Sequence, residues 1–294
     1  MLWPGPEGMT CYLCGSEQST WRKGQVRDNP NTQIHECDAC GLVYLSACEP
    51  NNSTAFYQEG GMHGGAENII PVDRWLREAA HDDSRRFESF REQIVNKNVL
   101  DFGCGAGGFL LRAREIAESV AGIELEKRLT PHFETNALSV CADINHFPSE
   151  RKFDIITAFH VIEHLPDPRN MLEKLKEHLT SAGEIIVEVP SADDALLTLY
   201  ENDPFSRFTY WSCHLYLFNA HTLSLLAKQA GLRVTYIKHV QRYPLSNHLY
   251  WLSRGKPGGH DHWTFLDSPE LDTAYENTLA RIGKTDTVIA CLTH

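Results

Sequence analysis

Short apolar runs alternate with amphipathic stretches from residue 98 to the end of the chain. The runs at 98–102 and 153–159 are nearly continuous in apolar residues, as expected of strands that are buried on both faces of a sheet. The stretches between the runs place apolar residues three or four positions apart, which is helical spacing. This alternation predicts an α/β fold with a doubly wound, mostly parallel sheet. Strands are expected at 98–102, 119–123, 138–142, 153–159, 183–189, 232–240 and 286–292, and helices near 107–117, 127–136, 169–179, 193–200 and 219–230.

Two segments precede the alternating region. Residues 71–95 place their apolar positions mostly at helical spacing and predict one or two helices. Residues 49–70 are rich in Gly and Asn and carry Tyr57, a candidate substrate contact. We expect this linker either to cover a ligand pocket as a lid or to pack its aromatic residues against a surface. The predicted organisation is a zinc-binding ribbon or knuckle at 1–48, the linker at 49–70 and the main domain at 71–294.

Four of the nine cysteines form two close pairs near the N-terminus. Cys11 and Cys14 make the first pair, Cys37 and Cys40 make the second, and a glycine follows each pair. Two such pairs supply four thiolates for tetrahedral Zn²⁺, and the glycines let backbone amides approach the sulfur atoms. A segment this small also needs a metal to stabilise its fold. We therefore predict a structural zinc ion, with four reduced cysteines as the alternative.

Composition narrows the class of partner. The formal charge of −12 disfavours nucleic acid, because phosphates attract clustered Lys and Arg, and it favours a small-molecule acceptor. No apolar stretch approaches the roughly 18 residues that a membrane span needs, so no membrane contact is expected. The first ten residues lack the basic start and apolar middle of a secretory signal. The sequence predicts a cytoplasmic protein.

The stretch VLDFGCGAGGFLL, residues 99–111, joins a strand to a glycine-rich turn. Gly103, Gly105 and Gly108 satisfy the G-x-G-x-x-G pattern of dinucleotide sites. A carboxylate at Asp101 would repel the pyrophosphate of NAD, whereas it favours a ligand that is positively charged there, such as S-adenosylmethionine. The DFG triplet of kinases also occurs here, but the chain has neither their HRD motif nor a Walker A lysine.

Two further acids end the next strands. Glu124 is placed to accept both hydroxyls of a ribose, and Asp143 is placed to accept from an adenine amino group. Ligands of open α/β sheets bind at these carboxyl ends, so three successive acids predict a nucleoside site. Neighbouring residues complete the predicted cofactor set: Cys104, Leu125 and Ile144.

The stretches VLDFGCGAGGFL, GIE, AD and FDIITAFHVIEHLPDP together resemble the successive motifs of class I S-adenosylmethionine-dependent methyltransferases. The resemblance covers about residues 70–294 and implies a Rossmann-like sheet of seven strands, the last antiparallel. The cysteine pairs ahead of it are similar to those of sugar C-methyltransferases that act on nucleotide-linked deoxysugars, although this chain lacks their long C-terminal domain. The resemblance implies that the cofactor is lined by Asp101, Gly103, Gly105, Glu124, Asp143, Phe159 and His160.

Three candidate catalytic residues follow the fourth strand of the alternating region. His160, Glu163 and His164 stand at positions i, i+3 and i+4, on one face of a helical turn. One histidine is expected to remove a proton from the acceptor as a general base. Alternatively, the trio binds a divalent metal, because quinone-pathway O-methyltransferases resemble this stretch with an acid in place of His160. A structural role for the Glu163–His164 pair is the third interpretation.

Aromatic and polar residues further along are candidates for the substrate side. The stretch YWSCHLYLFN brings His214, an alternative base, close to Tyr210, a candidate substrate contact. Residues 241–263 predict a long polar and aromatic loop that caps the acceptor pocket. It contributes Tyr243, Asn247 and His248 to the predicted substrate site.

These features predict an enzyme that moves the methyl group of S-adenosylmethionine to an oxygen or carbon nucleophile of a small polar acceptor. A nucleotide-linked sugar or another carbohydrate is the first acceptor class considered. A metal-assisted O-methyltransferase of quinone- or catechol-type molecules is the alternative. A zinc-bearing binding module without catalysis and an NAD-dependent oxidoreductase are the remaining hypotheses.

Overall fold

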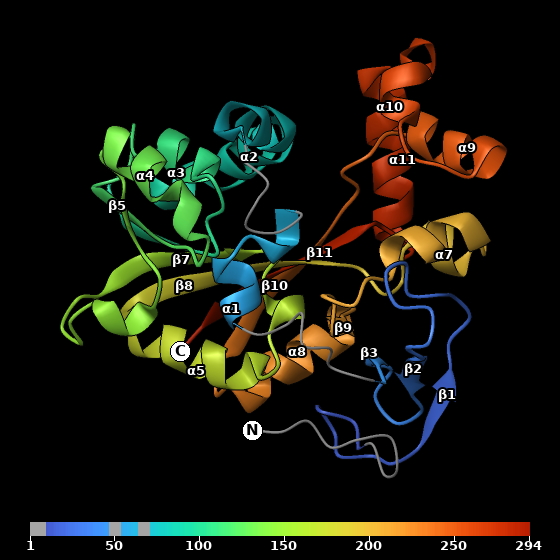
Figure 1. Ribbon diagram of the computed structural model, residues 1–294, viewed down its shortest axis with the longest axis horizontal. Helices are drawn as coiled ribbons and strands as arrows, with labels where there is room; N and C mark the ends of the chain where they lie inside the picture. The colour runs from blue at the N-terminus through green and yellow to red at the C-terminus, as the bar shows by residue number, and fades with distance from the viewer. Residues whose placement is uncertain (1–9, 47–53, 64–70) are drawn as a thin grey trace. The chain divides into compact units, whose positions relative to one another are not determined.

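The computed structural model describes residues 10–46, 54–63 and 71–294 (Figure 1). Seven strands form a sheet in the order β10-β11-β8-β7-β4-β5-β6, and β4 pairs in parallel with both β5 and β7. This sheet confirms the predicted α/β fold class. The strands are β4 (Asn98–Phe102), β5 (Ser119–Ile123), β6 (Ser139–Cys141), β7 (Phe153–Phe159), β8 (Leu179–Pro190), β10 (Arg233–Val240) and β11 (Thr287–Thr293).

The centre of the sheet consists of strands that are buried on both faces. In β7 six of the seven residues are buried, and in β4 four of the five are buried. Burying each large aliphatic side chain stabilises the fold by roughly 1.5–3 kcal/mol, which explains why most residues of these two strands are apolar. Thr157 is the polar exception in the middle of β7, and its hydroxyl donates to the carboxylate of Asp101 on the neighbouring strand.

The chain divides into two compact units. Unit 1 comprises Met1–Glu49, Glu188–Leu226 and Tyr236–Ala290, and unit 2 comprises Pro50–Val187, Ala227–Thr235 and Cys291–His294. Each unit is therefore built from segments that lie far apart in the sequence. The division into a zinc module, a linker and a main domain stays a prediction.

Unit 2 contains helices on both faces of its strands, with α2 and α3 on one side and α5 on the other (Figure 1). The longest, α2, buries Phe87, Phe90 and Ile94 along one stripe. The side chain of Asp167 begins α5 by accepting from the backbone N–H of Asn170. In the described ranges, no helix has both the length and the apolar character required to cross a membrane. The helices are α1 (Thr54–Gln58), α2 (Val72–Ile94), α3 (Gly108–Ala113), α4 (Thr130–Thr135) and α5 (Pro168–Glu177).

Unit 1 contains a second, antiparallel sheet with the order β1-β2-β3-β9. Its strands are β1 (Ser19–Trp21), β2 (Ile34–Cys37), β3 (Val43–Leu45) and β9 (Tyr216–Leu217). The N-terminal strands thus pair with a strand from the second half of the chain. The buried core below this sheet is formed by Val26, Ile34, Val43, Leu45, Ala192, Tyr210 and Leu217.

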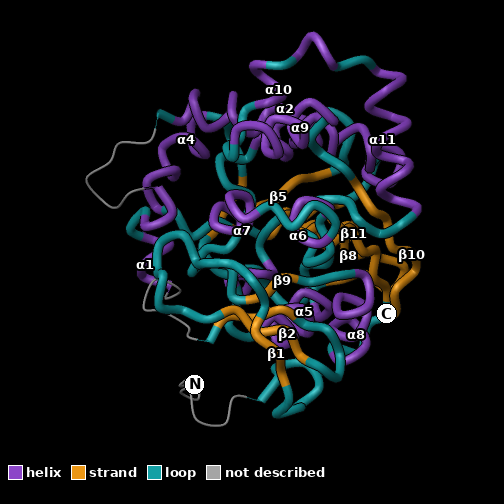
Figure 2. Tube along the Cα trace, turned by 90° about the vertical axis from the view of Figure 1, so that its right-hand side faces the viewer, coloured by secondary structure: helices purple, strands orange, loops and turns teal. Residues whose placement is uncertain are grey.

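The segment that we expected to be a long loop, residues 241–263, is mostly helical. Pro244 precedes α9 with extended backbone, and α9 buries Tyr250 and Trp251 on one face. Glycines and closely spaced aromatic residues had suggested a loop, but the buried residues Asn247, Tyr250 and Trp251 stand at positions i, i+3 and i+4, which is helical spacing. Figure 2 shows α9, α10 and α11 as helices. The remaining helices are α6 (Ala195–Thr198), α7 (Asp203–Thr209), α8 (Ala220–Gln229), α9 (Leu245–Arg254), α10 (Gly259–His262) and α11 (Pro269–Arg281).

Candidate active site

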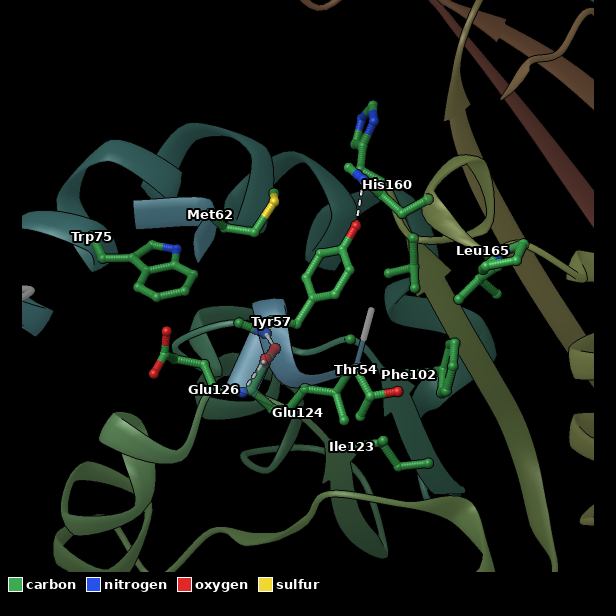
Figure 3. Close-up of a pocket in the computed structure, with 16 residues that line it drawn as sticks. Thr54, Tyr57, Met62, Trp75, Phe102, Ile123, Glu124, Glu126, His160 and Leu165 are labelled. Carbon is green, nitrogen blue, oxygen red and sulfur yellow. Dashed lines mark hydrogen bonds between the residues drawn. The ribbon is translucent and has the colours of Figure 1, made fainter. Parts of the chain in front are cut away.

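A cavity of about 290 Å³ opens at the carboxyl ends of β4 and β5 in unit 2 (Figure 3). Open α/β sheets bind their ligands at this edge, and the volume lies near the lower end of the usual range for small-molecule sites, roughly 300–1,000 Å³. The cavity is lined by Thr54, Tyr57, Met62, Trp75, Phe102, Gly103, Gly105, Ile123, Glu124, Leu125, Glu126, His160, Val161, His164, Leu165 and Pro166. Of the predicted cofactor residues, Gly103, Gly105, Glu124, Leu125 and His160 meet here.

The glycine-rich turn and Glu124 are joined by hydrogen bonds. The backbone N–H of Gly105 donates to Oε2 of Glu124 at 2.8 Å, and the N–H of Glu126 donates to Oε1 at 2.9 Å. Burial raises the pKa of Glu124, while these N–H groups oppose the rise. Gly103 has φ of 76°, and a Cβ there would lie 2.4 Å from Cγ2 of Val161. The turn therefore requires glycine, and Glu124 fixes its position beside the cavity.

The other two acids lie away from the cavity lining. Asp101 is only 3% exposed, and the hydroxyl of Thr157 donates to its Oδ1 at 2.7 Å. Burial raises the pKa of Asp101 to about 7, and the hydrogen bond from Thr157 opposes this rise. Asp143 is exposed, and its Oδ1 accepts from the backbone N–H of Asn145 at 2.9 Å. Contact between either acid and a cofactor stays a prediction.

Three more predicted cofactor residues pack beside the site. The ring of Phe159 lies 5.2 Å from that of Phe109. The guanidinium of Arg86 lies 4.6 Å from the centre of the Phe159 ring. Cys104 and Ile144 are buried apolar neighbours of the strand ends. None of these predicted residues is among the side chains that line the cavity. Their assignment to the cofactor therefore also stays a prediction.

The turn after β7 carries two of the candidate catalytic histidines at the cavity. His160 has φ of 56°, a conformation that costs of order 1 kcal/mol or more for a residue other than glycine. Its Nδ1 lies 3.3 Å from Oε1 of Glu163, whose side chain is fully buried. Nδ1 of His164 lies 3.4 Å from the hydroxyl of Tyr57. Tyr57 comes from α1, and Figure 3 shows it among the residues that line the cavity. The predicted linker thus does supply a residue to the pocket.

Two of the three predicted metal ligands, Glu163 and His164, bring ligand atoms within 4.8 Å of each other, and metal binding by the trio stays a prediction. Within the described ranges, His160, Glu163 and His164 do not present three ligand atoms within 4.8 Å of one another. His214 belongs to unit 1, where its ring lies 5.6 Å from that of Trp211. The geometry supports paired contacts of His160 with Glu163 and of His164 with Tyr57, which suit orientation and proton transfer.

Four of the predicted substrate residues belong to unit 1, and three of them line the same cavity. Tyr243, Asn247 and His248 line a separate cavity of about 150 Å³. Tyr210 is fully buried in the apolar core of that unit, which gives its ring a packing role. Substrate contact by these residues stays a prediction.

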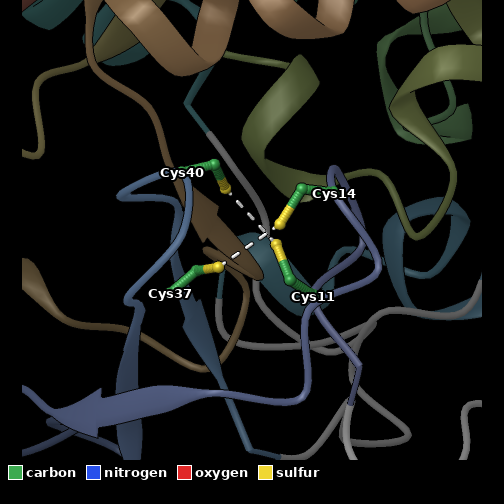
Figure 4. Close-up of side chains that lie close together, drawn as sticks. All are labelled: Cys11, Cys14, Cys37 and Cys40. Atoms are coloured by element: carbon green, nitrogen blue, oxygen red, sulfur yellow. Dashed lines mark hydrogen bonds between the residues drawn. The ribbon is translucent and has the colours of Figure 1, made fainter.

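The four N-terminal cysteines converge as the sequence predicts (Figure 4). All four sulfur atoms lie within 4.8 Å of one another, with Cys11 and Cys40 3.5 Å apart and Cys14 and Cys37 3.4 Å apart. The glycine after each pair has positive φ, 71° and 76°. A tetrahedral Zn²⁺ with bonds of about 2.3 Å spaces its sulfur ligands about 3.8 Å apart, so the cluster fits zinc.

The surroundings of Cys37 favour the thiolate form of its side chain. Burial raises its pKa, but backbone N–H groups of Cys40 and Ala39 together with neighbouring thiols outweigh this, and the pKa falls to about 7. Burial raises the pKa of Cys11 to about 11. A metal ion is the group that would let both sulfur atoms carry charge together.

Several cavity residues escaped the sequence analysis. Trp75 comes from α2, and Met62 comes from the short helical turn Gly61–His63. Both elements precede β4, the first strand of the large sheet along the chain. Glu126 stands two residues after Glu124 and forms an ion pair with Arg128 at 2.8 Å. Its position after a strand was a usable signal, whereas Trp75 could be placed only by the packing of α2 against α3.

The strand order and the nucleoside-type pocket define a Rossmann-like protein of the class I methyltransferase type. Residues 72–237, more than half of the chain, match the family described as "Methyltransferase domain". The chain belongs to that family and is an S-adenosylmethionine-dependent methyltransferase. This confirms the predicted class and the resemblance stated from the motifs.

Named relatives agree with this class, and solved structures agree with its fold. A tRNA U34 carboxymethyltransferase from Nautilia profundicola is 34% identical over 104 residues, which cover 32% of this chain and 35% of that enzyme. A ubiquinone biosynthesis O-methyltransferase from Coxiella burnetii is 26% identical over 176 residues, covering 55% and 75%. A Haloferax volcanii methyltransferase complex with the activator Trm112 aligns with TM-score 0.50 at 13% identity, over 77% of this chain and 99% of that one. An Archaeoglobus fulgidus S-adenosylmethionine-dependent methyltransferase aligns with TM-score 0.50 at 19% identity, over 74% and 94%.

Proposed function

We propose that this methyltransferase transfers a methyl group to an oxygen or carbon nucleophile of a small polar acceptor, with His160 as the general base. The observation that carries the proposal is the arrangement of His160, which lines the cofactor cavity in a strained backbone conformation with a fully buried carboxylate, Glu163, 3.3 Å from its Nδ1. Strain at a pocket residue is retained where the surrounding structure and function require it.

The unit 2 cavity fits S-adenosylmethionine by the chemistry of its donors. Glu124 presents a carboxylate beside the glycine turn and would accept from the ribose hydroxyls, while Trp75 and Leu125 supply apolar surface. Asp101 and Asp143 are proposed to act at the amino-acid tail and at the adenine, respectively. When bound, the cofactor supplies a methyl group on a positively charged sulfur, which is already activated for transfer. The protein's task is then to orient the acceptor and to remove one proton.

Glu163 is proposed to orient His160. A carboxylate that accepts from Nδ1–H holds the imidazole in one tautomer and leaves Nε2 as the basic nitrogen. His164 and Tyr57 form a second contact at the cavity and are proposed to shape the acceptor side. A divalent ion held by Glu163 and His164 is the competing mechanism.

We infer the class of methyl acceptor from the names of two relatives and from the net charge of the chain. The Coxiella enzyme is named for ubiquinone biosynthesis and the Nautilia enzyme for tRNA. A chain with net charge −12 is poorly suited to nucleic acid, so we propose a small molecule rather than tRNA. Neither relative is named for a carbohydrate, so a carbohydrate stands beside a quinol as a proposed acceptor.

The test measures methyl transfer from radiolabelled S-adenosylmethionine to nucleotide sugars, quinols and bulk tRNA. His160→Asn should lower kcat by about 100-fold or more, because general-base catalysis contributes roughly that factor. Binding of S-adenosylhomocysteine should change little in this variant. His81→Asn, which replaces an exposed histidine of α2, is the matched control.

Two results would contradict the base assignment. Activity of His160→Asn within twofold of wild type would remove His160 from the mechanism. Loss of activity with EDTA and its recovery with Mg²⁺ would support the metal-assisted alternative instead. Methylation of tRNA with a steep salt dependence would overturn the small-molecule acceptor.

We also propose that the N-terminal cysteine cluster binds one structural Zn²⁺. The support is the convergence of four sulfur atoms from two knuckles and the fit of their spacing to tetrahedral thiolate ligation. All four ligand positions are filled by protein, so the ion would hold the fold of β1–β3 rather than take part in methyl transfer.

A further inference from the structure

Unit 1 contains a second cavity, of about 150 Å³, formed by residues that the cofactor site does not use. A cavity of this size holds about one six-membered ring. Its lining mixes aromatic rings with buried polar groups from three separate segments of the chain: residues 190–209, 242–260 and 286. Such a mixture is typical of a ligand site, because a purely structural cavity in a core is lined by apolar side chains.

One wall of this cavity is aromatic. The ring of Trp251 lies 5.2 Å from that of Phe205 and 5.2 Å from that of Phe208. Phe208 is 44% exposed, although a ring of this size usually buries most of its surface. Tyr243, also partly exposed, lies 5.0 Å from the ring of His260. Phe208 therefore supplies the open ring surface of this wall, on which a flat or chair-shaped ring can stack. Trp251, only 3% exposed, packs behind it, and the guanidinium of Arg27 lies 5.8 Å from the centre of the Phe208 ring.

A buried hydrogen-bond network supports the polar wall. Nε2 of Gln241 donates to Nε2 of His248 at 3.2 Å, so Nδ1 of His248 carries the proton and donates to the hydroxyl of Tyr275 at 2.7 Å. The hydroxyl of Tyr275 in turn lies 3.2 Å from that of Tyr200. Burial lowers the pKa of His248 to about 4, which keeps the ring neutral. His248 thus holds the wall in place and contributes no charge.

The charged groups at the cavity largely cancel. Asp286 accepts from the backbone N–H groups of Arg242 and Tyr243, and its carboxylate lies 3.6 Å from the guanidinium of Arg242. Asp194 accepts from the N–H of Leu196 at 2.7 Å. Burial, together with the nearby Asp286, raises the pKa of Asp194 to about 8, so this carboxyl is mostly protonated at neutral pH. The site therefore offers no uncompensated charge for an anion or a cation.

We propose that this cavity binds an uncharged polyhydroxylated ring, a sugar or cyclic polyol, stacked on the Phe208–Trp251 wall with its hydroxyls directed to Asp194, Asn247 and His260. Polar groups from three segments suit hydroxyls all around a ring better than the two adjacent hydroxyls of a catechol. The identification of this ring as part of the methyl acceptor rests on the proposed function. Ring binding itself requires no methyl transfer.

The test is saturation-transfer NMR on the full chain without cofactor. The probes are glucose, galactose, mannose, rhamnose and myo-inositol, with glucosamine, glucuronate and catechol as comparisons. At least one neutral polyol should bind with Kd below about 10 mM and should bind better than its charged counterpart and catechol. Phe208→Ala should weaken this binding about tenfold, because aromatic stacking contributes about that factor. Phe265→Ala, which removes a ring that is 77% exposed and lies outside the cavity, should leave it unchanged.

Asp194→Asn tests whether Asp194 meets the ring as a neutral carboxyl. An amide resembles the protonated carboxyl, so the variant should keep affinity within about threefold at pH 7, whereas an ionised carboxylate would lose more. Circular dichroism of each variant checks that it is folded.

Binding of no neutral ring, stronger binding of a charged ring or catechol, or equal effects of Phe208→Ala and Phe265→Ala would overturn the inference. Ring binding without any binding of S-adenosylhomocysteine would instead defeat the proposed function alone. Methylation of a quinol without ring binding would defeat only this inference.

Discussion

Asp101 is a buried carboxyl at the end of the first strand of the nucleotide-binding sheet, and its charge changes near neutral pH. Burial raises its pKa to about 7, against about 3.9 for an aspartate in an unfolded chain. Between these values the folded chain holds a proton that the unfolded chain has released. The free energy of unfolding therefore falls as pH rises from about 4 to about 7, because ionisation then favours the unfolded state.

Asp101→Asn should remove this pH dependence. The free energy of unfolding of the variant, relative to wild type, should rise by on the order of 2 kcal/mol between about pH 5 and about pH 8. Urea unfolding of the cofactor-free protein at several pH values measures the difference. Glu115→Gln, an exposed carboxylate of the same unit, is the control and should show a flat difference. A flat difference for Asp101→Asn would mean that this carboxyl is ionised throughout.

At the scale of elements, the glycine turn between β4 and α3 tolerates no side chain at Gly103. An alanine there meets both a positive φ and a clash with Val161 at 2.4 Å. Gly103→Ala should lower stability by about 2 kcal/mol or more and reduce cofactor affinity, because the turn lines the cavity. Gly283→Ala shares the positive φ, at 66°, but its nearest neighbour lies 3.7 Å away. Thermal unfolding of both variants should therefore show a clearly smaller loss for Gly283→Ala, and equal losses would contradict the clash.

The cysteine knuckles make a second prediction at this scale. The purified protein should contain about one zinc per chain by elemental analysis, and Cys37→Ser should lose most of it with a fall in Tm of several degrees. Cys141→Ser, which changes a thiol at β6 outside the cluster, should keep its zinc. Zinc-free wild-type protein with unchanged Tm would show that the four cysteines stay reduced without a metal.

Element positions could be predicted well from the sequence where burial imposes a simple pattern. All seven strands of the large sheet fall where the sequence predicted them. The pattern is clearest in β7, β8 and β11, where burial on both faces favours runs of apolar residues. The helices of residues 241–281 were missed, since their glycines and aromatic residues are compatible with a loop until packing is known. The pairing of β3 with β9 joins residues 43–45 to 216–217, and local spacing contains no information on such a contact.

For the candidate site, the sequence indicated which types of side chain take part more reliably than where those side chains point. Glu124 was identified because an acid at the carboxyl end of a strand can accept from ribose hydroxyls. His160 was identified from its place after the fourth strand and from the family resemblance. Sequence could not show that Asp101 turns to Thr157, since the direction of a side chain is set by its packing. Trp75 was missed for the same reason, because it reaches the cavity from a helix that precedes every motif.

At the scale of the whole molecule, the two units contain cavities with different linings, for which we propose different ligands. Unit 2 presents an acidic, glycine-lined cavity suited to the cofactor, and unit 1 presents an aromatic and neutral cavity suited to a polyol ring. The central claim concerns the first cavity, that Glu124 and the glycine turn bind S-adenosylmethionine. Every later proposal about the acceptor and the base depends on it.

Titration calorimetry with S-adenosylhomocysteine tests that claim most directly. Wild-type protein should bind one molecule per chain, and Glu124→Gln should weaken binding about 10- to 100-fold by weakening hydrogen bonds to a charged acceptor. Glu134→Gln, an exposed control in α4, should bind like wild type. No heat with wild-type protein, or undiminished binding by Glu124→Gln, would contradict the account.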